Sequence, residues 1–241
     1  MKILKLQETD STNSWVSVND DRLSSPSLVY SINQTQGRGQ RGNSWESEPG
    51  KNITASLFFH PKNFEASKQF YLSEAIALAI TDFLQDLGIS AKVKWPNDIY
   101  VKDKKICGIL VEHVVTGKYI TRSIAGFGIN INQKKFFSDA PNPTSVSLIT
   151  GKEYDIEELI ISLSKKLDKY LKALEGIQNL HEIFISNLWR NDGNFYEFYD
   201  KKVNEKIKAG IISIAEDGIL TLKTETGEKR EYAFKEIEFI L

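Results

Sequence analysis

Short apolar runs separated by polar turns recur along the chain, and they predict a fold rich in strands. We expect strands at residues 3–6, 28–34, 52–60, 106–115 and 119–132. A further run at residues 91–101 is interrupted by Pro96, which removes a backbone donor, so this run is expected to bend. Asp103-Lys104-Lys105 is expected to form a polar hairpin turn. Successive strands with short turns favour a mixed, largely antiparallel sheet over repeated βαβ units.

Apolar residues at helical spacing predict helices that pack on this sheet. The longest such pattern spans residues 66–87 and is followed by Gly88, a residue typical of the position just beyond a helix. A second helix is expected to begin with Asp155 as its N-cap and to run through residue 174. A third helix is expected at residues 177–190.

The pattern changes near residue 201 to short strands joined by tight turns. These strands are expected at residues 203–214, 219–223, 228–234 and 237–241. Roughly forty residues of this kind suit a small β-barrel appended to a main domain. We therefore expect two domains, residues 1–195 and residues 196–241.

Composition describes an ordinary globular chain and argues against several functional classes. The chain has 241 residues, of which 41% are hydrophobic and 26% are charged. A formal net charge of −1 argues against a general nucleic-acid binder. One cysteine, Cys107, excludes an intramolecular disulfide, and three scattered histidines give no zinc-ligand spacing, so no protein metal site is expected. The N-terminus is too polar for a signal peptide, and no apolar run approaches the roughly 18 residues of a membrane span. A cytoplasmic location without a membrane partner is expected.

Residues 34–45 read Gln-Thr-Gln-Gly-Arg-Gly-Gln-Arg-Gly-Asn-Ser-Trp and form the densest polar motif of the chain. Glycines allow several backbone N–H groups to face one anion. Arginine adds a planar positive fork suited to phosphate or carboxylate, and Trp45 offers a surface on which a flat ring can stack. The sequence therefore predicts an anion-binding loop.

The glycines of this loop also match the spacing of the dinucleotide fingerprint Gly-x-Gly-x-x-Gly. That fingerprint requires a helix that starts within the glycines, whereas residues 43–50 have no helical apolar period and end in Pro49-Gly50. A carboxylate about twenty residues on, Glu65, is expected to open a helix rather than to end a strand. We therefore do not expect a Rossmann turn.

The stretch Asp10-Ser11-Thr12-Asn13 allows two interpretations. Its Asp, Ser or Thr side chain can serve as the N-cap of a helix that follows. Alternatively, Ser11, Thr12 and Asn13 point small donors and acceptors into a pocket. The residues alone favour the cap.

Four motifs in order make the chain resemble biotin protein ligases. Ser11-Thr12-Asn13 matches the family's Ser-Thr-Asn, and residues 37–45 match its glycine/arginine loop. Its Lys-Trp-Pro-Asn-Asp signature stands at residues 94–98, followed at the family's spacing by Lys-Ile-Cys-Gly-Ile-Leu-Val-Glu at residues 105–112. Its Gly-x-Gly-Ile-Asn motif stands at residues 126–130. The resemblance implies an α+β fold: a mixed, largely antiparallel sheet flanked by helices, similar to class II aminoacyl-tRNA synthetases, with a C-terminal SH3-like β-barrel.

The resemblance also implies an activity, namely ATP-dependent biotin ligation. Biotin is activated as biotinyl-5′-AMP with release of pyrophosphate and is then passed to one lysine of a biotin carboxyl carrier domain of a biotin-dependent carboxylase. No protein nucleophile is required, which agrees with the absence of a Ser/His/Asp or Cys/His arrangement. Positioned cations and backbone donors supply the catalysis, and Mg²⁺ is expected to enter with ATP.

Site residues are carried over from the family by motif position. Those implied for biotin are Ser11, Thr12, Asn13, Gln34, Gly37, Arg38, Gly39, Gln40, Lys105, Gly108 and Leu110. Those implied for ATP are Arg38, Arg41, Trp45, Lys94 and Asn130. Those implied as catalytic are Arg38, Lys94, Asp98 and Lys105, with Asp98 organising the cations or the metal. Gln40 departs from the arginine that many members carry, and Arg41 is its candidate substitute.

Two other functional classes remain open. A lipoate or octanoate ligase or transferase has a similar fold, although the intact Lys-Trp-Pro-Asn-Asp and glycine/arginine motifs favour biotin. A biotin-sensing repressor carries an N-terminal helix-turn-helix, and the roughly ten residues before Ser11 are too few for that unit. We therefore expect the short, enzyme-only form with no nucleic-acid partner, and a homodimer is left open.

Overall fold

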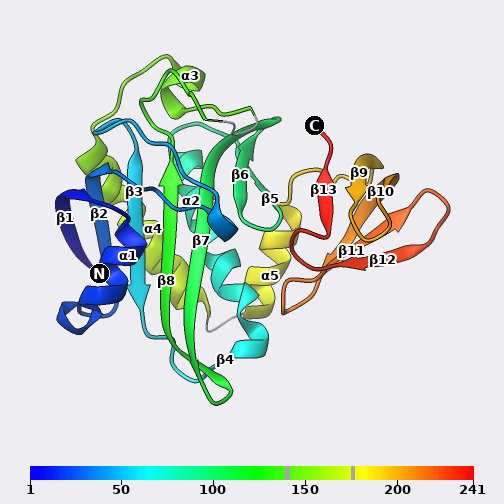
Figure 1. The fold of residues 1–241 in the computed structure, drawn as a ribbon, viewed down its shortest axis with the longest axis horizontal. Helices are drawn as coiled ribbons and strands as arrows, with labels where there is room; N and C mark the ends of the chain where they lie inside the picture. Colours follow the sequence, from blue (N-terminus) through cyan, green and yellow to red (C-terminus); the bar gives the residue numbers. More distant parts are fainter. Residues whose placement is uncertain (139–141, 175–176) are drawn as a thin grey trace.

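Two β-sheets form the framework of the protein, and they lie side by side in Figure 1. The computed structural model describes residues 1–138, 142–174 and 177–241. The strands of the larger sheet are β1 (Lys2–Thr9), β2 (Ser27–Gln34), β3 (Ile53–Phe59), β4 (Phe64–Glu65), β5 (Lys92–Lys94), β6 (Asp98–Val101), β7 (Lys104–Thr116) and β8 (Tyr119–Ile129). Their order is β1-β2-β3-β8-β7-β6-β5, and β4 pairs with β8. The pair β1–β2 is parallel and the other pairs are antiparallel, which confirms the predicted mixed sheet.

Helices pack on both faces of the larger sheet. On one face lies α2 (Phe70–Asp86), which is covered in turn by α4 (Ile156–Ala173) and α5 (Ile177–Ser186). On the other face α1 (Thr12–Asn19) contacts β2, β3 and β8. Asp155 accepts hydrogen bonds from two backbone N–H groups at the start of α4, which confirms the predicted cap. None of the described helices is both long and apolar enough to cross a bilayer.

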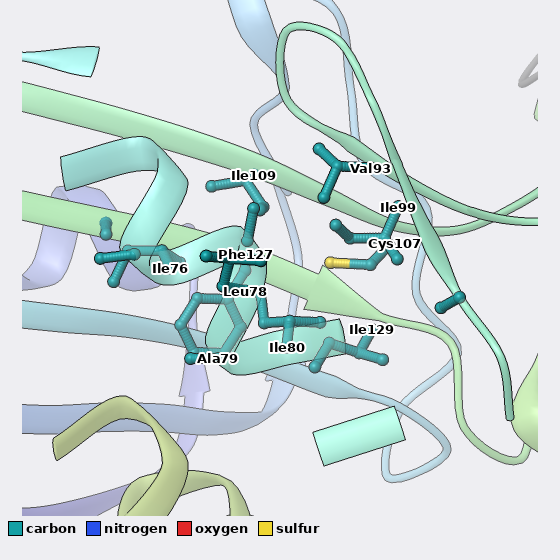
Figure 2. Close-up of a cluster of buried hydrophobic side chains, with 14 of the residues drawn as sticks. Ile76, Leu78, Ala79, Ile80, Val93, Ile99, Cys107, Ile109, Phe127 and Ile129 are labelled. Atoms are coloured by element: carbon teal, nitrogen blue, oxygen red, sulfur yellow. The ribbon is translucent and has the colours of Figure 1, made fainter. Parts of the chain in front are cut away.

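Alternation along the central strands decides which residues face α2 and which face the open side. Cys107 and Ile109 of β7 and Phe127 and Ile129 of β8 join the core under α2, as Figure 2 shows. Because successive side chains of a strand point to opposite faces, the even-numbered positions of these segments face away from α2. The open side of the sheet is therefore lined by the glycines of β7 and β8.

The smaller sheet contains the C-terminal strands. They are β9 (Tyr196–Asp200), β10 (Glu205–Ile214), β11 (Leu220–Thr224), β12 (Lys229–Tyr232) and β13 (Ile237–Phe239). All pairs are antiparallel in the order β12-β11-β10-β9-β13. The antiparallel strands agree with expectation, but within the described chain β12 and β13 do not pair, so the sheet is open rather than a closed barrel. β9 was not among the strands expected from the sequence.

Three local expectations need correction. The helix expected at residues 66–87 begins at Phe70, after a 3-10 turn (Ala66–Lys68), and Glu65 ends β4 because it pairs with Tyr119. Lys105 lies in β7 instead of the hairpin turn. The helix α5 ends at Ser186, since Val93 of β5 donates to Asn187 O and accepts from Trp189 N, which draws this segment out of the helix.

Candidate active site

A cavity of about 660 Å³ opens on the face of the larger sheet opposite α2. Its floor is made by β7 and β8, where Gly108 stands opposite Gly128 and Leu110 opposite Gly126. A Cβ atom on Gly108 or Gly128 would overlap the Trp45 indole, so the close approach of this ring requires glycine at both positions. The two glycine-containing motifs thus form a shallow floor on which an aromatic ring lies.

The glycine loop folds back on itself above this floor. Trp45 N donates to Gly37 O at 2.8 Å, and Gly39 N donates to Asn43 O at 2.6 Å. Between them lies a three-residue 3-10 turn (Gln40–Gly42), in which Gly42 has a φ of +86° that favours glycine. No longer helix follows the glycines, which agrees with the expectation that this is not a Rossmann turn.

Two polar groups of the loop are buried and have no hydrogen-bond partner among the residues that the structure describes. Both the Trp45 indole Nε1 and the Gln40 Oε1 are in this state, and both residues line the cavity. A buried donor or acceptor without a partner costs about 1–3 kcal/mol, so both groups are suited to pairing with a bound ligand. Arg41 follows Gln40, but its side chain lies outside the described residues.

The polar end of the cavity gathers residues from α1 and β2. Thr12 donates from its N and its Oγ1 to Gln34 Oε1, at 2.9 and 3.2 Å. Ser11 occupies the N-cap position of α1, but its hydroxyl makes no capping hydrogen bond. The pocket interpretation therefore describes this segment better than the side-chain cap, and the Ser11 hydroxyl is available to a ligand.

The polar atoms of the Asn13 amide are hydrogen-bonded to other groups of the protein. Its Oδ1 accepts from Ser56 Oγ at 2.6 Å, and its Nδ2 donates to Glu112 Oε2 at 2.7 Å and to Leu110 O at 3.3 Å. Asn13 still lines the cavity, but its polar atoms are occupied. The structure thus separates Asn13 from Ser11, although the two lie close in sequence, whereas the Thr12 hydroxyl is bonded to Gln34 and Ser56.

A lysine–aspartate pair lies beside the glycine floor. Lys105 Nζ is 2.7 Å from Asp98 Oδ1, and the two side chains are only 20% and 17% exposed. Asn97 holds this arrangement because its backbone and its side chain both hydrogen-bond to Ile109 of β7. The same ammonium lies 5.6 Å from the centroid of the Trp45 ring. The Lys-Trp-Pro-Asn-Asp turn and the Lys105 strand are therefore fixed to each other at the cavity.

Lys94 contributes a second, more buried ammonium. It lies over the rings of Tyr100 and Phe239, at 5.2 and 4.9 Å from their centroids. Burial lowers the pKa of Lys94 below its ordinary value, and the Asp98 carboxylate opposes that shift. Lys94 makes no ion pair within 4.0 Å in the described chain, so its charge is available to an anion in the cavity.

Arg38 and Asn130 lie at other parts of the wall. Arg38 Nη2 is 2.8 Å from Glu112 Oε1, a partner that the sequence did not suggest. Asn130 is only 3% exposed; its Nδ2 donates to Thr144 O at 3.0 Å, and its Oδ1 has no partner in the described part of the chain. Asn130 Oδ1 can therefore accept a hydrogen bond from a ligand.

Several residues of the site were not anticipated. The C-terminal sheet contributes part of the wall through Lys201, Phe234, Lys235, Ile237, Glu238 and Phe239. No motif in the sequence identifies these residues as part of a site, because they reach the cavity only through contact between the two sheets. Ser56 and Glu112 could have been found from the sequence. Each is a polar residue that alternates with core residues of its strand, so it is expected on the opposite face of the sheet. Among the residues that the structure describes, no three His, Cys, Asp or Glu side chains cluster as a metal site.

Comparisons with known proteins agree on one family. Residues 3–130 match the Biotin/lipoate A/B protein ligase family. The chain is 29% identical over 217 residues to the bifunctional ligase/repressor BirA of Bacillus spizizenii, covering 86% of this chain and 64% of that protein. It is 31% identical over 177 residues to the biotin–[acetyl-CoA-carboxylase] ligase of Paracoccus denitrificans, covering 70% of this chain and 73% of that protein. The biotin protein ligase from Aquifex aeolicus in complex with biotin and ATP superposes with a TM-score of 0.80 at 26% identity, covering 99% and 98% of the two chains.

Proposed function

The chain belongs to the Biotin/lipoate A/B protein ligase family, and we propose that it is an ATP-dependent biotin ligase. In this proposal the biotin carboxylate oxygen attacks the α-phosphorus of ATP, and the bond to pyrophosphate breaks. The amine of a carrier-domain lysine then attacks the acyl carbon of the adenylate, loses a proton and releases AMP. Residues 1–195 would form the catalytic domain and residues 196–241 the C-terminal domain.

The observation that carries the proposal is the order of groups along one cavity. Hydroxyl and amide groups of Ser11, Thr12 and Gln34 line one end, and the Lys105–Asp98 pair lies beside the glycine floor. Asn130 adds a buried acceptor on the same cavity. Such an arrangement suits a ligand with a polar head, a reacting anion and an amine-bearing base, as in a biotinyl adenylate.

The polar end favours biotin over lipoate. The ureido ring of biotin has two N–H donors and a carbonyl acceptor, whereas the dithiolane of lipoate has neither. A dithiolane would offer no hydrogen bond to the buried Ser11 hydroxyl, which lines this end and makes no capping bond, and such a loss typically discriminates strongly against an analogue. The lipoate or octanoate alternative is therefore the weaker candidate.

The chemistry would depend on positioned charge. Lys105, held by Asp98, and Arg38 would neutralise the two anions that must approach each other, and Lys94 would add a desolvated cation near the phosphates. Asn130 Oδ1 would accept from the exocyclic amine of adenine, and the Trp45 ring would pack against the bound adenylate. We propose that Mg²⁺ enters with ATP as part of the substrate, and that the Asp98 carboxylate, an oxygen ligand of the kind Mg²⁺ prefers, lies within its reach. The cytoplasmic location and the absence of a nucleic-acid partner remain predictions.

The decisive test is transfer to a carrier domain. We would incubate the protein with biotin, MgATP and the apo form of a biotin carboxyl carrier domain, and measure the intact mass of the carrier. A gain of one biotinyl group is expected, and a parallel incubation with lipoate should give none. Unmodified carrier in the biotin reaction, or modification only by lipoate, would overturn the proposal.

Lys105 provides the first prediction at the site itself. Lys105→Ala removes the cation at the reacting carboxylate, and the rate of adenylate formation is expected to fall roughly 100-fold or more. The measurement is pyrophosphate release with saturating biotin and ATP. Lys104→Ala, at the neighbouring exposed position of β7, is the matched control and should retain the parent rate. Parent-like activity in Lys105→Ala would remove this residue from the site.

A further inference from the structure

Glu112 is a carboxylate to which the proposed function assigns no role. Its Oε1 accepts from Arg38 Nη2 at 2.8 Å, and its Oε2 accepts from Asn13 Nδ2 at 2.7 Å. Glu112 belongs to β7, Arg38 to the glycine loop and Asn13 to α1. One side chain therefore joins three separate segments of the chain.

The Asn13 side of this contact is rigid. Asn13 is only 2% exposed, and its Oδ1 accepts from the fully buried Ser56 hydroxyl. Gly126 of β8 leaves the room for this amide, because a Cβ atom there would overlap Asn13 Oδ1. With both ends of its amide bonded, Asn13 has one orientation, and its Nδ2 directs Glu112 Oε2.

The Arg38 side is held mainly by Glu112. Apart from the ion pair, the guanidinium makes one long hydrogen bond among the described residues, from Nη1 to Ser14 Oγ at 3.4 Å. The other bonds that shape the loop join backbone groups. An arginine on a glycine-rich loop has many accessible rotamers, so a fixed carboxylate is an effective means of restricting it.

The position of Glu112 leaves Arg38 accessible to the ligand. Arg38 lines both the large cavity and a neighbouring cavity of about 440 Å³, whereas Glu112 lines only the latter. A guanidinium has five N–H donors, and Glu112 engages one nitrogen of the fork. The remaining donors can therefore serve an anion in the large cavity while Glu112 holds the group from the other side.

We propose that Glu112, itself oriented by Asn13 and Ser56, is the positioning residue that holds Arg38 toward the reacting carboxylate and phosphate. This inference rests on the proposed ligase function for its catalytic consequence. It also assigns Asn13 to the support of Arg38 instead of to direct contact with biotin. The series of hydrogen bonds runs from the buried strand β3 through α1 and β7 to the glycine loop.

A double-mutant cycle tests this path. Glu112→Gln keeps the shape of the side chain and removes its charge, and it should slow pyrophosphate release roughly tenfold or more, because small displacements of a reacting group are costly. In an Arg38→Ala background the same substitution should change the rate less than twofold. Glu65→Gln is the matched control, because Glu65 has a similar exposure and forms an ion pair with Lys118 far from the cavity. Equal losses from Glu112→Gln with and without Arg38 would overturn the proposal.

A second readout does not depend on catalysis. Amide hydrogen exchange of residues 37–45 in the protein without substrates should be faster in Glu112→Gln and unchanged in Glu65→Gln. Glu112→Asp, which keeps the charge on a shorter side chain, should recover part of the protection and would replace Glu112→Gln if that variant failed to fold. Absence of pyrophosphate release in the parent would contradict the ligase function alone, whereas unchanged exchange in both Glu112 variants would contradict the positioning role.

Discussion

At the scale of single residues, the site depends on which atoms the protein leaves unpaired. Within the described residues, Asn130 donates from Nδ2 to Thr144 O and its Oδ1 has no partner, whereas both polar atoms of the Asn13 side chain are hydrogen-bonded. The two asparagines have the same side chain, so their different roles follow only from their neighbours. The same reasoning separates Lys105, which Asp98 holds in place, from Lys94, which is surrounded by aromatic rings.

Gln40 provides a prediction at this scale. Its Oε1 is buried and has no partner in the described chain, and its neutral amide stands where the family resemblance implies arginine in many members. Gln40→Arg would replace a neutral contact to the adenylate by a charge-assisted one, for which about 1.5–3 kcal/mol is typical. We expect the adenylate to escape at least roughly tenfold more slowly, measured by chasing labelled biotinyl adenylate from the protein with unlabelled substrate. Equal release rates in variant and parent would show that this position does not retain the intermediate.

At the scale of elements, strand alternation accounts for part of the floor that the glycine motifs form. The spacing of Gly126 and Gly128 around Phe127 already places both glycines on one face of a strand. The alternation of side chains within one strand does not show which strand lies beside it, however. β3 pairs with β8, which lies about seventy residues further along the chain. The close approach of the Trp45 ring to Gly128 and the contact of Glu112 with Arg38 both depend on that pairing, so neither could be predicted from the sequence pattern.

The C-terminal sheet was harder to predict for a related reason. Its strands alternate, and turns such as Asp217-Gly218 are evident, so its antiparallel character followed from the sequence. Closure into a barrel depends on whether β12 and β13 meet, which is a tertiary property that local pattern does not encode. The contribution of this sheet to the cavity wall likewise depends on tertiary contacts that local pattern does not encode.

The contact between α2 and α5 contains a buried titratable pair. Glu74 Oε1 lies 2.8 Å from His181 Nδ1, and the other Glu74 oxygen has no partner in the described chain. Burial raises the pKa of Glu74 to about 7, and the nearby histidine opposes part of that shift. A carboxyl whose pKa is higher in the folded state keeps its proton after the unfolded chain has lost it. Its stabilising contribution is therefore complete below about pH 4.5 and is lost as the pH rises to about 7.

Glu74→Gln should remove this pH dependence, because glutamine keeps a hydrogen-bonding side chain that does not titrate. Between about pH 4.5 and pH 7 the free energy of unfolding of the parent should fall relative to the variant by up to about 3 kcal/mol. Urea unfolding at several pH values measures the difference. Glu182→Gln removes a charge from an exposed position of α5 and is the matched control. Parallel curves for Glu74→Gln and the parent would mean that Glu74 is not protonated in the folded protein.

At the scale of the whole molecule, the C-terminal sheet holds one side of the Lys-Trp-Pro-Asn-Asp turn. Trp95 Nε1 donates to Gly218 O at 3.0 Å, and Phe239 of β13 covers Lys94. On the other side, Asn97 ties the same turn to Ile109 of β7. The turn that carries Lys94 and Asp98 is therefore held between the two sheets, so their relative placement should influence the cations of the cavity.

Trp95→Phe tests this link because it removes the indole N–H and keeps an aromatic ring at the buried position. Loss of the hydrogen bond to Gly218 should lower the free energy of unfolding by about 1 kcal/mol beyond the effect of Trp15→Phe, whose indole makes no hydrogen bond in the described chain. Because Lys94 and Asp98 flank Trp95, kcat/KM for ATP should also fall about tenfold, whereas Trp15→Phe should leave it near the parent value. Urea unfolding and initial rates of pyrophosphate release at varied ATP measure the two effects. If Trp95→Phe lost stability but kept parent kinetics, the second sheet would support the fold without positioning the cations, because the same bond would then be broken with no displacement of Lys94 or Asp98.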